Sequence, residues 1–145
     1  MKQGLRLSPL FAILFATACA PMPREGHNAL VSPLGGWIVV QWNQMKIQRF
    51  TIMFDPDGKF SGTVACNALA GEYKDDGRSI MITQSDLTMV ACQGAQSDKA
   101  QKAFDTMSRE KGLTYKFGGD ELLLRGENQL WKLKRIAAGS DVNPQ

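Results

Sequence analysis

The stretch FTIMFDPDGKFSGTVAC, residues 50–66, decides the fold of this chain. Its first half alternates large apolar residues with Thr51 and Met53, which is the pattern of a strand with one buried face. The DPDG sequence at residues 55–58 then supplies turn chemistry, since proline presets φ and glycine accepts a positive φ. The return half alternates in matching parity and predicts that the sulfur of Cys66 lies on the buried face. These residues therefore predict a β-hairpin.

Short strands separated by tight turns are expected along the rest of the chain. Aromatic, β-branched and alternating apolar runs predict them at residues 37–42, 79–83, 113–117, 121–125 and 129–134. Many short strands of this kind favour a closed or nearly closed antiparallel sheet, which leaves no free edge to aggregate. The sequence thus predicts a mainly β fold, a small antiparallel barrel-like sheet.

One helix is expected, at about residues 97–111. Four apolar residues fall at i, i+3, i+4 and i+7 and share one face: Ala100, Ala103, Phe104 and Met107. Ser97 is a candidate N-cap and Gly112 a candidate terminator. We expect this helix to plug or flank the barrel.

The two tryptophans of the first strand differ in parity, so an unbroken strand would point them to opposite faces. One of Trp37 and Trp42 is expected in the core. The other is expected either to close a barrel end or to be exposed for binding, and Trp42 is our candidate for the exposed aromatic.

Residues 1–19 have the layout of a bacterial export signal. Lys2 and Arg6 precede an apolar run at residues 10–16, which is shorter than the roughly 20 residues needed to span a bilayer. Ala16-Thr17-Ala18-Cys19 resembles the lipobox of bacterial lipoproteins, although Ala16 stands where Leu, Val or Ile is usual. We expect a signal peptide at residues 1–18 and a lipid on Cys19; ordinary signal cleavage and an uncleaved anchor are the alternatives.

This signal predicts where the protein works and how the chain is divided. We expect an exported protein, held at the membrane of the cell envelope by the lipid on Cys19. In a Gram-negative cell, Ala20 after the cysteine favours the outer membrane, facing the periplasm. A flexible tether is expected at residues 19–33, one domain at 34–136 and a frayed tail at 137–145.

Charge excludes one class of partner. Removing residues 1–18 leaves 127 residues with 15 basic and 14 acidic side chains, a formal charge of +1. That length suits one domain with a modest core. No basic stripe stands out, so we expect no nucleic-acid partner. We also expect the protein to be a monomer.

Cys66 and Cys92 are expected to form a disulfide, the default for a cysteine pair in an oxidising compartment. Closing a loop of about 27 residues would stabilise the fold by roughly 3–4 kcal/mol. Two neighbouring free thiols or a reactive pair remain as alternatives. A zinc site lacks ligands, because the one histidine, His27, falls in the expected tether.

No pattern of catalytic residues is found. A nucleophile has no histidine base within the expected domain, no Gly-x-Ser-x-Gly occurs, and the carboxylate pairs fall in expected turns. The seven methionines are dispersed, which favours core filling over a copper site. The sequence therefore predicts neither an enzyme nor a metal or other cofactor.

A set of small, polar and cysteine residues recurs in a known family. The pieces are Gly62-x-x-x-Cys66-Asn67-x-x-x-Gly71-x-Tyr73 and Thr88-x-x-x-Cys92. Together they resemble the META domain family, that of the HslJ-type bacterial heat-shock lipoproteins, over roughly residues 34–135. Ala65 departs from the pattern, since a glycine commonly precedes the Cys-Asn pair. The resemblance implies a barrel-like domain with a helix, a link to envelope stress, and no established catalysis.

We interpret the shared residues as structural first. Asn67 suits a strand exit where it bonds nearby backbone, Gly71 permits close approach, and Tyr73 buries its ring while its hydroxyl finds a partner. Thr88 is expected to bond locally beside Cys92.

The main functional hypothesis is a non-enzymatic envelope lipoprotein that acts in heat or envelope stress tolerance by binding an unidentified partner at the membrane surface. A barrel carrier of a small apolar ligand, and an inhibitor of a cell-wall lytic enzyme or protease, are the alternatives.

Overall fold

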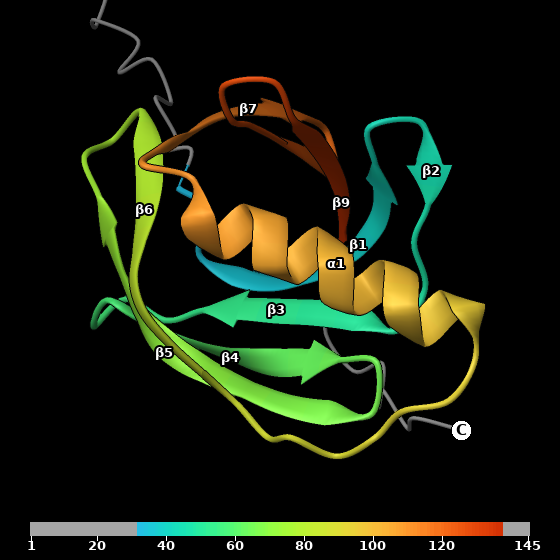
Figure 1. The fold of residues 1–145 in the computed structure, drawn as a ribbon. Helices are drawn as coiled ribbons and strands as arrows, with labels where there is room; N and C mark the ends of the chain where they lie inside the picture. The colour runs from blue at the N-terminus through green and yellow to red at the C-terminus, as the bar shows by residue number, and fades with distance from the viewer. Residues whose placement is uncertain (1–31, 138–145) are drawn as a thin grey trace, which may run out of the picture.

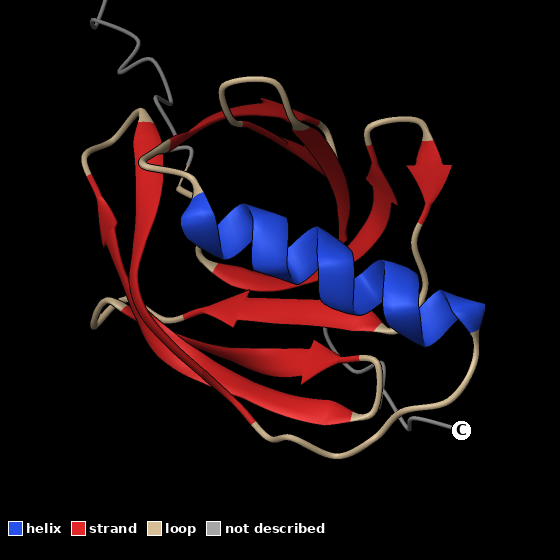
Figure 2. Cartoon of the chain, viewed as in Figure 1, coloured by secondary structure: helices blue, strands red, loops and turns tan. Residues whose placement is uncertain are grey.

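One antiparallel sheet and one helix make up residues 32–137, the part of the chain that this computed structural model describes (Figure 2). The expected signal peptide, Cys19, and most of the tether and tail lie outside the described residues. In chain order the elements are β1 (Gly35–Trp42), β2 (Met45–Lys46), β3 (Phe50–Phe54), β4 (Lys59–Val64), β5 (Asn67–Asp75), β6 (Ser79–Leu87), α1 (Ala95–Arg109), β7 (Leu113–Gly118), β8 (Glu121–Arg125) and β9 (Leu130–Arg135).

Eight strands form a closed antiparallel barrel, which confirms the predicted fold class. Each strand from β3 to β9 pairs with the next, and β1 closes the ring by pairing with both β3 and β9. β2 pairs only with the end of β1. The pairing of β6 with β7 is the shortest in the ring, at Ser79–Thr114 and Ile80–Leu113. The connection between these two strands is α1, which lies across the space that the curved sheet encloses (Figure 1).

The hairpin predicted from residues 50–66 is present, with one error at its end. β3 and β4 pair from Phe50–Val64 to Phe54–Phe60, around the turn at residues 55–58. The return strand stops at Val64, however, and Ala65 turns the chain with a φ of 58°. The expectation that Cys66 lies on the buried face is therefore wrong: Cys66 is exposed, because it lies in the β4–β5 turn rather than in the strand.

The helix begins two residues earlier than expected, at Ala95, and the residue before it is Gly94. Ser97 is not the N-cap, since it lies inside the first turn and its hydroxyl donates to the carbonyl of Gln93 at 2.9 Å. The predicted apolar stripe is confirmed, and it lines the core. Within residues 32–137, no helix is long and apolar enough to cross a bilayer.

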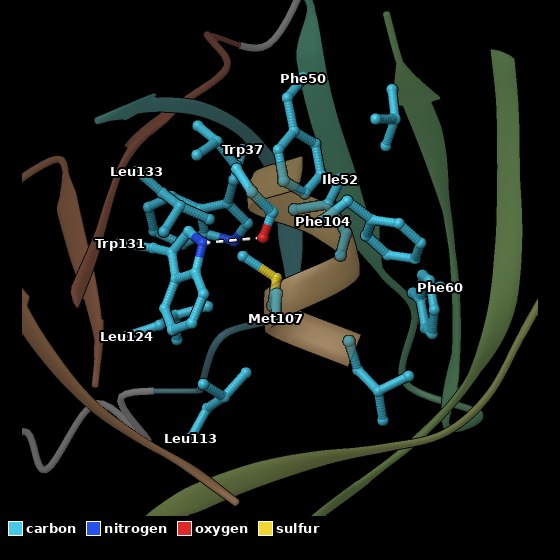
Figure 3. Packing of buried hydrophobic residues seen from close by; sticks show 14 of the residues in the cluster. Trp37, Phe50, Ile52, Phe60, Phe104, Met107, Leu113, Leu124, Trp131 and Leu133 are labelled. Carbon is cyan, nitrogen blue, oxygen red and sulfur yellow. Dashed lines mark hydrogen bonds between the residues drawn. The ribbon is translucent and has the colours of Figure 1, made fainter. Parts of the chain in front are cut away.

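The core joins the helix stripe to the inward faces of the strands (Figure 3). Phe104 of α1 meets Phe50 of β3 edge to face, with ring centroids 5.9 Å apart. On β9, which flanks β1 on the side away from β3, the indole N–H of Trp131 donates to the backbone carbonyl of Ala103. The barrel interior is thus filled by side chains from both the sheet and the helix, including Met107.

The two ends of the described domain lie side by side. The Ile136 N–H donates to the Gly36 carbonyl at 2.9 Å. The guanidinium of Arg135 stacks 4.2 Å from the Trp37 ring and donates to the Leu34 carbonyl. The chain therefore enters and leaves the barrel at the same end.

Candidate functional site

Trp42, the candidate exposed aromatic, is not exposed. A bulge between Val39 and Gln41 shifts the pairing of β1 with β9, so the strand is not unbroken. Trp37 and Trp42 are consequently both buried, at 0% and 5% exposure. The Trp42 indole N–H donates to the side-chain oxygen of Gln129 at 2.7 Å. The prediction that Trp42 is exposed is therefore wrong, because a bulged strand does not keep the strict alternation of a regular one.

Three of the shared residues, Gly62, Gly71 and Tyr73, serve packing. A Cβ on Gly62 would collide with the carbonyl of Thr51 on the neighbouring strand, and one on Gly71 would collide with the carbonyl of Gln84. Tyr73 is buried, and its hydroxyl donates to the Asp55 carbonyl at 2.7 Å.

The Tyr73 pKa lies above its ordinary value, mainly because burial disfavours the phenolate and secondly because Asp75 repels it. This matches the structural role expected of the residue, and it leaves the phenol protonated at neutral pH.

The other shared residues, Cys66, Asn67, Thr88 and Cys92, come together at one place. They join the start of β5 to residues 88–94, the segment between β6 and α1, which we call the 88–94 loop. Asn67 is buried, and the carbonyl of its side chain accepts from the Val90 N–H at 2.8 Å and from the Thr88 hydroxyl at 3.0 Å. Its amide nitrogen donates to the Val90 carbonyl and to the Cys92 sulfur, both at 3.1 Å.

Thr88 fixes the beginning of the 88–94 loop to the backbone of β5. Its hydroxyl accepts from the Ala68 N–H at 2.9 Å, and its own N–H donates to the Ala68 carbonyl at 3.0 Å. All four hydrogen bonds of the Asn67 side chain therefore join residues more than twenty positions away, and none joins nearby backbone as expected. Thr88 likewise bonds across the sheet to Ala68 and Asn67 rather than locally as expected.

The predicted disulfide between Cys66 and Cys92 is present, with 5.6 Å between the two Cα atoms. The Cys66 N–H also donates to the Cys92 sulfur at 3.1 Å. Ala65 holds the left-handed conformation that a glycine adopts without strain, which explains why glycine is usual in the family pattern at this position. Disulfide and Asn67 network together hold the 88–94 loop against the barrel.

The loop so held exposes two apolar side chains, which our sequence analysis did not identify. Met89 is 92% exposed and Val90 60% exposed. The one available indication was their place between two anchoring residues, Thr88 and Cys92, outside any strand alternation. Large apolar side chains presented by a well-fixed loop are typical of an interaction surface.

A groove of about 590 Å³ lies beside these two residues. One wall is apolar and comes from the 88–94 loop with Ala65; the other comes from α1 and includes Asp98, Gln101 and Asp105. The Gln101 amide donates to Asp105 at 3.1 Å, which positions that carboxylate on the helix surface. The groove thus combines an apolar wall with negative charge.

A second groove lies at the other end of α1, lined mainly by charged residues such as Arg109, Lys111 and Arg125. The Glu110 carboxylate enters it and accepts from the Glu127 N–H at 3.1 Å. Basic and acidic groups are therefore mixed there. Within residues 32–137, no three His, Cys, Asp or Glu side chains are grouped as a metal site requires.

Comparisons with known proteins identify the domain. The family profile of the META domain matches residues 31–138. No curated protein matches the chain.

Three solved structures share the fold. An NMR structure of a protein from Burkholderia xenovorans has a TM-score of 0.62 at 16% identity, over 90% of this chain and 100% of its own. A second NMR structure has a TM-score of 0.57 at 17% identity, over 69% and 87%. The crystal structure of a DUF4847 family protein from Bacteroides vulgatus has a TM-score of 0.52 at 16% identity, over 72% and 94%.

Proposed function

Because the chain belongs to the META domain family, we propose that it is a non-enzymatic envelope lipoprotein that binds a protein partner through the 88–94 loop and the adjoining groove. The lipid on Cys19 would hold the domain at the membrane surface, and binding would contribute to heat or envelope stress tolerance. The sequence around Cys19 supports the anchor, and the resemblance to heat-shock lipoproteins supports the stress role.

The observation that carries the binding role is the exposure of Met89 and Val90 on a loop fixed at both ends. Leaving such side chains in water forgoes about 1.5–3 kcal/mol of burial each. The Asn67 network and the disulfide hold the loop in one shape, so binding would not have to order it. Methionine also adapts to apolar surfaces of varied shape.

The groove indicates which partner would fit. Asp98 and Asp105 line its helix wall, opposite the apolar wall. A protein segment that carries large apolar residues next to Lys or Arg would complement both walls. Segments of this kind become accessible when envelope proteins unfold, which connects the site to stress.

A paired binding measurement tests this proposal. We expect apolar peptides with a basic flank to bind the wild-type protein, and their affinity to fall at least tenfold in a Met89→Ser/Val90→Ser variant. Met53→Ser is the matched control, because Met53 is 46% exposed on β3 and should leave binding unchanged. Equal affinity of both variants would contradict the assigned surface.

Two cellular measurements test the anchor and the stress role. Cys19→Ala should move the protein from the membrane fraction to the soluble fraction. A deletion strain should lose heat or envelope-stress tolerance. Expression of the Met53→Ser protein in that strain should restore tolerance, whereas expression of the Met89→Ser/Val90→Ser protein, the loop variant, should not. A deletion strain as tolerant as its parent would overturn the stress role.

Inhibition of a lytic enzyme or protease is a second candidate, because a fixed, protruding apolar loop is also what enters an active-site cleft. A panel of lysozymes and proteases tests it, with the loop variant as the inactive control. The ligand-carrier alternative is not favoured, since core side chains such as Trp37, Phe104 and Trp131 fill the barrel interior.

A further inference from the structure

We propose that the Cys66–Cys92 disulfide is a thiol–disulfide exchange site, in which a dithiol protein attacks Cys66 and Cys92 is the leaving sulfur. The inference concerns the chemistry of the bond and does not depend on what the 88–94 loop binds.

The position of the bond makes it accessible. Cys66 is exposed in the β4–β5 turn and Cys92 is half-buried in the 88–94 loop, so the bond lies at the surface rather than in the core. Exposed disulfides are reduced more readily than buried structural ones.

The surroundings of the two sulfurs differ, and this difference sets the direction of attack. The Cys66 N–H and the Asn67 amide both donate to the Cys92 sulfur, each at 3.1 Å. Among residues 32–137, no hydrogen bond is donated to the Cys66 sulfur. Donors favour the negatively charged form of an acceptor, so a thiolate on Cys92 would be stabilised and one on Cys66 would not. A more stable thiolate is the better leaving group.

The exchange balances in two steps. A partner thiolate attacks the Cys66 sulfur, a new sulfur–sulfur bond forms, and the electron pair of the Cys66–Cys92 bond passes to Cys92 as a thiolate. The second thiolate of the partner then attacks the partner's first sulfur, the one bonded to Cys66 in the mixed disulfide. This forms a disulfide within the partner and releases Cys66 as a thiolate. The partner leaves oxidised by two electrons, and water supplies the protons that Cys66 and Cys92 take up. The Val90 carbonyl, 3.5 Å from the Cys92 sulfur, can accept the resulting S–H.

The first test maps the mixed disulfide. The folded full-length protein is treated briefly with reduced glutathione, quenched with acid, and analysed by peptide mass spectrometry. We expect glutathione on Cys66 in roughly three- to tenfold excess over Cys92, in line with the dependence of exchange on the leaving thiol. An equal or reversed ratio would overturn the proposal, as would a bond that dithiothreitol reduces only after the protein has been unfolded.

The second test measures the two thiols separately. Alkylation by iodoacetamide as a function of pH gives the midpoint for Cys92 in Cys66→Ser and for Cys66 in Cys92→Ser. We expect the Cys92 midpoint to be lower by at least about one pH unit, since a thiolate with donors ionises earlier. Coincident midpoints would count against the asymmetry.

A pair of variants separates the donor from general loosening of the loop. Asn67→Ala removes one donor to Cys92 and should reduce the Cys66 preference. Thr88→Val removes hydrogen bonds that fix the loop but leaves both donors in place, so it should keep the wild-type ratio. Equal loss of preference in both variants would assign the effect to loop mobility and overturn the role of Asn67.

Discussion

The indole N–H of Trp131, on β9, donates a hydrogen bond of 3.1 Å to the backbone carbonyl of Ala103, in the middle of α1. Both residues are fully buried. The bond joins the helix to the barrel wall across 28 positions of sequence, next to the residue that makes the Phe50–Phe104 contact. The helix is therefore fixed against the barrel wall by a directional contact as well as by the apolar packing of its buried face.

Replacing Trp131 should be costly. We expect Trp131→Phe to lower the free energy of unfolding by about 2–4 kcal/mol, because it removes a buried hydrogen bond and part of the indole volume. Urea denaturation measures the loss. Lys132→Ala is the control: the half-exposed Lys132 makes only a surface ion pair with Glu121, and its loss should change stability by less than about 1 kcal/mol.

The glycines of the barrel should differ sharply in their tolerance of alanine. A Cβ on Gly62 would collide with the Thr51 carbonyl, which β-strand pairing holds in place, so we expect Gly62→Ala to cost about 1–3 kcal/mol. Gly118 has open space around it and needs no positive φ, so Gly118→Ala should change stability by less than about 0.5 kcal/mol. Similar melting temperatures for the two variants would contradict the close approach at Gly62.

The disulfide should stabilise the whole domain. We expect Cys66→Ala/Cys92→Ala to lower the free energy of unfolding by about 2–4 kcal/mol, because the unfolded chain regains the freedom of the closed loop. Chemical denaturation of oxidised and reduced wild-type protein should show the same difference. Met89→Ser alters the same loop without breaking the cross-link, and an equal loss in that variant would argue against the cross-link as the cause.

Stability should fall at alkaline pH through Tyr115. Burial, and next the 3.0 Å hydrogen bond from its hydroxyl to the Asp75 carboxylate, raise the pKa of Tyr115 to about 12. An unfolded tyrosine ionises near pH 10. Between these values the unfolded state loses a proton that the folded state keeps, so the stabilisation present below about pH 10 is lost as the pH rises towards 12.

Phenolate absorbance measures this ionisation directly, because the chain has only two tyrosines and Tyr115→Phe leaves Tyr73 alone. Asp75→Asn should lower the midpoint of Tyr115. A wild-type midpoint near 10 for Tyr115 would contradict the prediction.

Alternation of apolar residues was enough to predict the β3–β4 hairpin, the i, i+3, i+4, i+7 spacing predicted the buried face of α1, and the series of short strands with tight turns predicted the barrel, because these features depend on local sequence patterns. The errors arose where the backbone leaves that periodicity. The bulge between Val39 and Gln41 brings Trp42 into the core, and the left-handed Ala65 ends β4 before Cys66. Neither position carries a glycine or proline that would have indicated the change.

The candidate site was only half predictable for a different reason. The pairing of Cys66 with Cys92 followed from the type of compartment expected. The bonds that Thr88 and Val90 donate to Asn67 connect the start of β5 to the 88–94 loop, which lies more than twenty positions away, so sequence spacing contained no trace of them. Met89 lies in the loop that those bonds hold, outside any strand, so its exposure could not be inferred from alternation.

The hydrogen bond from the Ile136 N–H to the Gly36 carbonyl keeps the first and last strands of the domain together, so the order of the strands along the chain could be changed. A short linker between the two ends of the described domain would circularise it with little strain, and new termini could be opened at the exposed turn containing Gly77, where an added Cβ would meet no neighbouring atom. Such a circular permutant should keep the barrel and its core, since no strand pairing would be interrupted.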